Sequence, residues 1–215
     1  MFSVKTQEGA RKKSSSGQRS AAPSQALQWI WNYLQGAANL RILDCGTVSA
    51  ATVNLLTQRH AKVYIADMIA PLQRGDPAYW KQAGKQTVFR LDELLKQLPV
   101  IPPASLSLIF GWHLLDLVPR EHVAELVGVL VSLLKPGGIF YFFLREPNLT
   151  HGKDGRWWLE SLTSLGAEGE ELGKFPYAPL TNREIERLTT GCSLKTFLTR
   201  SHRREVVVLK DEEEI

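Results

Sequence analysis

The chain has 215 residues, of which 44% are hydrophobic and 22% are charged. This composition is that of one ordinary globular domain, alone or with short tails, and it excludes a collagen, a coiled coil, a disulfide-rich scaffold and a fully disordered chain. The two cysteines, Cys45 and Cys192, belong to no CxxC or CxxH pair. The sequence therefore spells out neither a zinc site nor a disulfide framework, and we expect a reducing, cytoplasmic location.

The formal net charge of +4 comes from one end of the chain, because residues 1–20 hold five Lys or Arg residues against one Glu. A nucleic-acid-binding domain carries its excess cations on the folded surface, where they neutralise phosphates. Outside residues 1–20 and the short basic run 200–204 no such excess is present, so we expect no nucleic-acid partner. The apolar runs fall far short of the roughly 20 residues that a membrane span requires, so we expect no membrane span.

Residues 1–23 are predicted to form a disordered basic tail, because they are rich in Ser and hold almost no large apolar residue. Their Arg and Ser content leaves an organellar presequence open as an alternative. Residues 211–215 are predicted to be a solvated acidic end. The folded domain is then expected over residues 24–210.

The first predicted element is a helix that begins after the N-cap residue Ser24 and ends at Gly36, with apolar residues at helical spacing: Leu27, Ile30, Trp31 and Leu34. A strand at 40–44, a helix at 51–58 and a strand at 62–67 follow, and together they form a βαβ unit.

The same alternation continues towards the C-terminus. Its predicted elements are a strand at 87–91, a helix at 92–98, a strand at 105–110, a helix at 120–134, a turn at 135–138, a strand at 139–144, a helix at 182–189 and strands at 194–199 and 205–209. The pattern predicts a doubly wound α/β domain with a mostly parallel, seven-stranded sheet and a C-terminal antiparallel hairpin. Its ligands are expected at the carboxyl ends of the strands, near the topological switch point.

Three segments resemble the class I S-adenosylmethionine-dependent methyltransferases. They are Ile-Leu-Asp-Cys-Gly at 42–46, Tyr-Ile-Ala-Asp at 64–67, and Leu-Leu-Lys-Pro-Gly-Gly at 133–138, which looks like the L-K-P-G-G turn of small-molecule enzymes with this fold. The resemblance covers roughly residues 38–210. It implies S-adenosyl-L-methionine as cofactor, with its methionine end beside the first of these segments, and methyl transfer to oxygen, nitrogen or carbon of a small-molecule acceptor.

The resemblance also implies a set of cofactor-binding residues at the strand ends: Asp44, Gly46, Thr47, Asp67, Met68, Asp92 and Gly111. Asp67 either accepts hydrogen bonds from both ribose hydroxyls or is a solvated strand end or helix cap. Asp92 either lies near the adenine amine or is the N-cap of the helix at 92–98. Gly111 leaves room for the cofactor. His113 is a candidate general base, or it packs in the wall of the pocket.

The first turn departs from the family's acid-x-Gly-x-Gly-x-Gly form, because Val48 and Ala50 stand at its second and third glycine positions. Ser107 replaces the acid near the start of the fourth strand. Two functions therefore stay open: methyl transfer, or a catalytically silent methyltransferase-like binding or scaffold protein. An NAD-dependent dehydrogenase needs a glycine-rich turn that this chain lacks.

Aromatic residues between the fifth and sixth strands carry two interpretations. Trp157, Trp158 and the loop at 175–179 either line an acceptor pocket, or belong to a helix that starts near Asp154 and packs on the sheet.

Overall fold

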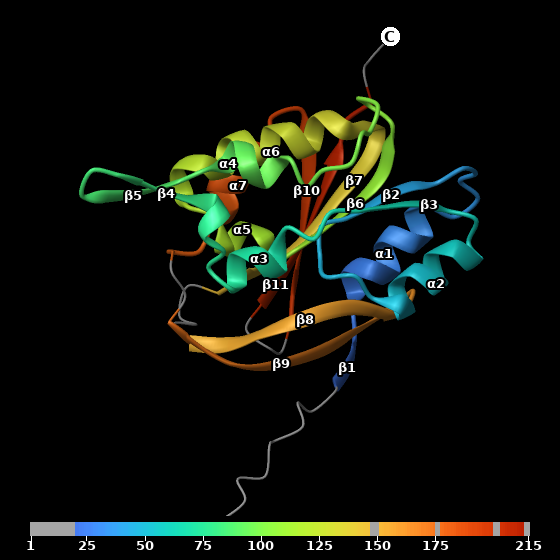
Figure 1. Cartoon of the computed structure of the whole chain (residues 1–215). Coiled ribbons are helices and arrows are strands. Elements are labelled where there is room, and N and C mark those ends of the chain that lie inside the picture. Colours follow the sequence, from blue (N-terminus) through green and yellow to red (C-terminus); the bar gives the residue numbers. More distant parts are fainter. Residues whose placement is uncertain (1–19, 147–150, 175–176, 200–202, 213–215) are drawn as a thin grey trace, which may run out of the picture.

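A computed structural model describes residues 20–146, 151–174, 177–199 and 203–212. Its main sheet has six strands in the order β10-β11-β7-β6-β2-β3 (Figure 1). The strands are β2 (Arg41–Asp44), β3 (Lys62–Ile65), β6 (Leu106–Trp112), β7 (Leu134–Arg145), β10 (Cys192–Leu198) and β11 (Arg203–Lys210). Strands β3, β2, β6 and β7 pair in parallel, and β11 is antiparallel to both β7 and β10. The predicted α/β class with a C-terminal antiparallel hairpin is confirmed.

Helices cover both sides of this sheet, with α1 and α6 on opposite sides in Figure 1. They are α1 (Gln25–Tyr33), α2 (Ala50–Gln58), α3 (Ile69–Gln73), α4 (Leu91–Leu95), α5 (Leu114–Leu117), α6 (Arg120–Leu133) and α7 (Asn182–Leu188), with a 3-10 turn at Pro77–Tyr79. Ser24 caps α1 as predicted, and its hydroxyl oxygen accepts the Leu27 backbone N–H at 3.0 Å. All seven residues of β6 are buried, as expected of a strand covered on both faces.

A second sheet lies below the carboxyl edge of the first in Figure 1. Two of its three strands come from the segment between β7 and α7, in which the sequence predicted a helix or a loop. Its strands β1 (Ser20–Pro23), β8 (His151–Ser161) and β9 (Ser164–Lys174) pair antiparallel in the order β1-β9-β8. The predicted helix near Asp154 is therefore wrong. The predicted tail boundary is also wrong, because residues 20–23 pair with 164–167 of β9. Residues 1–19 of that tail, and 213–215 of the acidic end, lie outside the described residues.

The strand predicted at 87–91 belongs to a separate hairpin of β4 (Trp80–Ala83) and β5 (Gln86–Phe89). The described main sheet therefore has six strands and not the predicted seven. The physical reason lies in burial: only Phe89 of β5 is buried, whereas a central strand of a parallel sheet is covered on both faces. Residues 135–138, which are predicted to form a turn, belong to the start of β7. Gly137 has a positive φ of 69°, a conformation to which glycine is suited.

Candidate cofactor site

The first strand of the predicted site ends at Asp44, whose side chain is only 4% exposed. Its Oδ1 atom accepts the backbone N–H of Gly46 at 2.9 Å and the indole N–H of Trp112 at 2.6 Å. Burial raises the pKa of Asp44 from 3.8 to about 6, although both hydrogen bonds act in the opposite direction. The carboxyl group of Asp44 is thus already hydrogen-bonded to two groups of the protein, the Gly46 backbone and the Trp112 indole.

The second partner of Asp44, Trp112, ends strand β6 with a positive φ of 48° and is 1% exposed. Its ring lies directly against Gly46, because a Cβ atom placed on that glycine would be 2.5 Å from the indole Cδ1 and 2.6 Å from Nε1. The indole also stacks on Phe110, with ring centroids 5.3 Å apart, and meets Phe143 at 5.8 Å. Gly46 therefore allows a close approach, and the approaching group is the side chain of Trp112.

Asp67 and Met68 follow the end of β3, and Thr47, from the turn after β2, lies beside Asp67. Asp67 is half-buried, and its Oδ1 accepts the Ala70 backbone N–H at 3.0 Å and the Thr47 hydroxyl at 3.4 Å. Met68 is fully buried, and its backbone N–H donates to the Cys45 carbonyl at 3.1 Å. Asp67 thus binds a backbone N–H in the first turn of α3, although the N-cap residue of this helix is Met68. Its predicted role towards a ribose stays a prediction.

Gly111 and His113 lie at the end of β6, on either side of Trp112. A Cβ atom on Gly111 would lie 2.6 Å from the ring of Phe140, so the absent side chain makes room for that ring. His113 is 4% exposed, and its Nε2 lies 2.9 Å from the side-chain nitrogen of Gln73. The burial of His113 agrees with the interpretation that this side chain packs in the protein. Its role as a general base stays a prediction.

Asp92 lies apart from the other candidates. It follows the separate β4–β5 hairpin, in the first turn of α4, and forms an exposed ion pair with Arg90 at 3.1 Å. The N-cap of this helix is Arg90, so the predicted N-cap role of Asp92 is wrong. A contact with an adenine ring stays a prediction.

The two residues that replace glycines do not fill the space beside Gly46. Val48 is 50% exposed, and its carbonyl oxygen accepts a hydrogen bond from the guanidinium of Arg156. Ala50 begins α2. The sequence did not predict that Trp112 occupies this space. The one signal in the sequence was a large aromatic residue directly after Gly111, at the end of a predicted strand.

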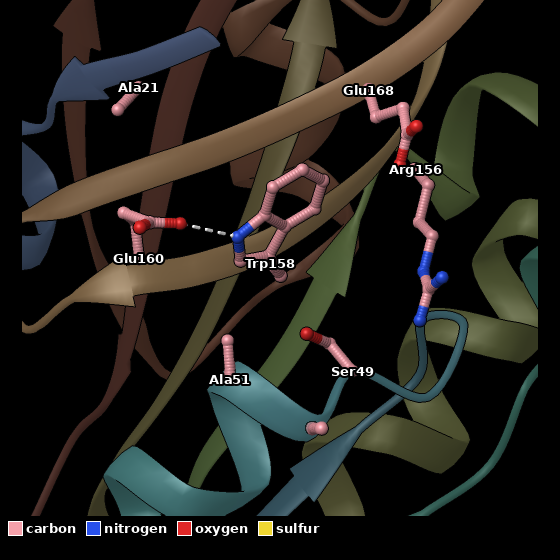
Figure 2. A pocket seen from close by; sticks show the side chains of 8 residues that line it. Ala21, Ser49, Ala51, Arg156, Trp158, Glu160 and Glu168 are labelled. Atoms are coloured by element: carbon pink, nitrogen blue, oxygen red, sulfur yellow. Dashed lines mark hydrogen bonds between the residues drawn. The ribbon is translucent and has the colours of Figure 1, made fainter. Parts of the chain in front are cut away.

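Two cavities flank β8, one on each of its faces. The first, of about 510 Å³, lies between β8 and the start of α2, and Figure 2 shows Ser49, Arg156, Trp158 and Glu160 around it. The second, which we call the inter-sheet cavity, has a volume of about 640 Å³ and lies between the two sheets, with Trp157 in its wall. The two tryptophans face different cavities because neighbouring side chains of a strand point to opposite faces. An acceptor pocket lined by both is not what the structure shows.

Within the described part of the chain, no three His, Cys, Asp or Glu side chains come together in a way that could hold a metal ion. No helix there is long and apolar enough to span a membrane. Both cysteines are free thiols.

Comparison with known proteins gives similarities to solved structures only. No family model and no curated protein matches the chain. A SAM-dependent methyltransferase from Methanosarcina mazei is 18% identical with a TM-score of 0.48, over 86% of this chain and 98% of that one. The 1,6-didemethyltoxoflavin-N1-methyltransferase of Burkholderia thailandensis, solved with S-adenosylhomocysteine, is 13% identical with a TM-score of 0.48, over 87% and 77% of the two chains. Magnesium protoporphyrin IX methyltransferase from Synechocystis, with bound SAM, is 17% identical with a TM-score of 0.47, over 86% and 76%. All three are named as methyltransferases, the family that the three sequence segments resemble.

Proposed function

We propose that this chain is a methyltransferase-like binding protein that does not transfer methyl groups. The observation that carries the proposal is the position of Trp112, whose indole covers Gly46 and donates to Asp44. These two residues are the ones that the sequence resemblance assigns to the methionine end of S-adenosylmethionine. The residues present therefore do not fit this cofactor.

Moving the ring of Trp112 out of this space costs several kcal/mol of free energy, as the following contacts show. It is 1% exposed, it is stacked on Phe110, and its N–H is bonded to a buried carboxyl group. Exposing a tryptophan that buries about 150–250 Å² costs about 4–6 kcal/mol at 25 cal/mol per Å². Such a cost would weaken a micromolar affinity to about millimolar or worse.

Calorimetric titration with S-adenosylmethionine and S-adenosylhomocysteine tests the proposal. The wild-type protein is expected to give no measurable binding of either compound. Trp112→Gly removes the ring and also suits the positive φ at this position, so it is expected to gain affinity for S-adenosylhomocysteine. Trp80→Ala, in the separate β4–β5 hairpin, is the control and is expected to bind neither compound.

Micromolar binding by the wild-type protein would overturn the proposal. Trp112→Gly protein that is folded by circular dichroism but still does not bind would show that Trp112 is not what closes the site.

Methyl transfer to a small-molecule acceptor is the second candidate function. It is favoured by Asp67, which remains half-buried beside Thr47 at the carboxyl end of β3. Both candidates imply a small-molecule partner, and the titration above decides between them. The cytoplasmic location stays a prediction.

A further inference from the structure

We propose that the cavity between β8 and the start of α2, which we call the α2 cavity, binds a small zwitterion with one carboxylate and one quaternary ammonium group. This inference rests on the proposed function, for which it names a ligand class and a binding site. The volume of the α2 cavity, about 510 Å³, falls within the range of about 300–1,000 Å³ that is usual for small-molecule sites. The described residues that line it include none of the cofactor candidates, so the α2 cavity differs from the space that Trp112 occupies.

One end of the α2 cavity offers hydrogen-bond donors to an anion. Ser49 is only 7% exposed, and its hydroxyl, which points into the cavity in Figure 2, does not cap α2 and has no hydrogen-bond partner among the described residues. The cavity also reaches Ala50 and Ala51 in the first turn of this nine-residue helix. The first N–H groups of an α-helix have no partner within the helix, and they favour a negative charge. A buried, unsatisfied hydroxyl beside such a helix start indicates a bound anionic group.

The charge at this end fits a single carboxylate. The guanidinium of Arg156 donates to the carbonyl of Val48, next to Ser49, and this neutral acceptor leaves the positive charge in place. Glu168 stands opposite Arg156 in the register of β8 and β9, and it offsets part of that charge. Arg156 is the single Lys or Arg among the described lining residues, so a doubly charged phosphate would be poorly balanced beside Glu168. A carboxylate with one charge is the better match.

The other end of the α2 cavity suits a cation. Figure 2 shows Glu160 and Arg156 on opposite sides of the Trp158 ring. The Oε2 atom of Glu160 accepts the indole N–H of Trp158 at 2.7 Å, which holds a carboxylate at the edge of the ring. A tryptophan ring attracts a cation over its face, and a carboxylate beside the ring adds to this attraction.

The contacts available at this end favour a quaternary ammonium over a primary one. A primary ammonium needs hydrogen-bond acceptors, but the Oε2 atom of Glu160 already accepts the indole N–H. The methyl groups of Ala21 and Ala51 also line the cavity, and the methyl groups of a quaternary ammonium can pack against them. The ring of Trp158 packs against Gly166 of the neighbouring strand, so its position is fixed before a ligand binds.

The test is calorimetric titration of the full chain with γ-butyrobetaine and with 5,5-dimethylhexanoate, an isostere in which carbon replaces the charged nitrogen. The wild-type protein is expected to bind the betaine about threefold to thirtyfold more tightly, because a cation over a tryptophan ring contributes about that much. Glu160→Gln keeps the shape of the side chain but removes its charge, and it is expected to reduce this preference. The inference is overturned if the wild type binds both compounds equally, or neither, or if Glu160→Gln keeps the full preference.

Ser49→Ala tests the anionic end. It is expected to weaken binding of both compounds about tenfold to a hundredfold, because each loses a hydrogen bond to its carboxylate. The fold is expected to keep its stability, since this hydroxyl does not cap α2. Ser132→Ala is the matched control: its hydroxyl binds the Val129 carbonyl within α6, away from the cavity, and the variant is expected to bind like the wild type. Unchanged binding by Ser49→Ala, or equal loss in the two serine variants, would also overturn the inference.

Failure of this inference is separate from failure of the proposed function. Binding of S-adenosylmethionine by the wild type overturns the proposed function, whereas the inference depends only on the two carboxylates titrated here. Trp112→Gly is expected to bind γ-butyrobetaine like the wild type, because Trp112 does not line the α2 cavity. A large change in that variant would place the betaine in the space beside Gly46 and overturn the inference.

Discussion

Replacement of the buried acid in Asp44→Asn tests the electrostatics of the predicted cofactor site. Because the pKa of Asp44 is raised from 3.8 to about 6, the folded protein holds this proton more tightly than the unfolded chain does. Each pKa unit corresponds to about 1.4 kcal/mol, so ionisation of Asp44 costs the folded state about 3 kcal/mol. This contribution to stability is fully present below the ordinary pKa of 3.8 and is lost as the pH rises through about 6.

The assay is urea unfolding of wild-type and Asp44→Asn protein across this pH range. Effects of all other groups cancel in the difference between the two free energies of unfolding. We expect that difference to shift by about 2–2.5 kcal/mol in favour of the variant between pH 4 and pH 7. Asp92→Asn is the control and is expected to shift in the opposite direction, because Arg90 lowers the pKa of the exposed Asp92. A constant difference between wild type and Asp44→Asn would refute the burial argument.

Two further predictions concern packing. Gly46→Ala is expected to destabilise the fold by about 1–3 kcal/mol in urea unfolding, because the new methyl group meets the buried indole of Trp112. Combining it with Trp112→Phe should cost less than the sum of the two single changes, and simple additivity would contradict the contact. Deletion of residues 1–23 is expected to lower the thermal midpoint by about 2–4 °C relative to deletion of residues 1–19, because it removes β1 from its pairing with β9. Equal midpoints would show that β1 adds no stability.

Most of the main sheet could be predicted because its signals are local. The segment 139–144 is an unbroken apolar run, and it forms the buried part of β7. The helix caps are also local, as Ser24 shows for α1. A strand buried on both faces and a capped helix each leave a pattern within a few residues, which one sequence is enough to reveal.

The second sheet could not be predicted, because its strand signals are weak and its partners are remote. Gly155 and Gly166 interrupt the pattern of β8 and β9, and glycine inside a strand lowers any expectation of one. The structure gives the reason for Gly166: the ring of Trp158 from the neighbouring strand occupies the place of its side chain. Strand β1, which completes this sheet, lies at the other end of the chain.

The sequence places two acids of the candidate site at strand ends, but it does not show what packs on them. Asp44 and Asp67 do lie at the carboxyl ends of adjacent strands, as alternating strands and helices require. The motif around Asp44 says nothing of what packs on it, because the contact with Trp112 comes from a strand much later in the chain. A short motif encodes the backbone of a turn, and the long-range packing decides what the turn holds.

The position of β11 has a consequence for how the protein is made. This strand is the last of the strands that the structure describes, yet it lies between β7 and β10, and Arg204 to Val208 are all buried. During synthesis the hydrogen-bonding edge of β7 therefore stays unpaired on one side until residues 203–210 have left the ribosome. An uncovered apolar strand edge of this kind invites association with other chains. Chains that stop before β11 are thus expected to aggregate rather than to fold as a shorter domain.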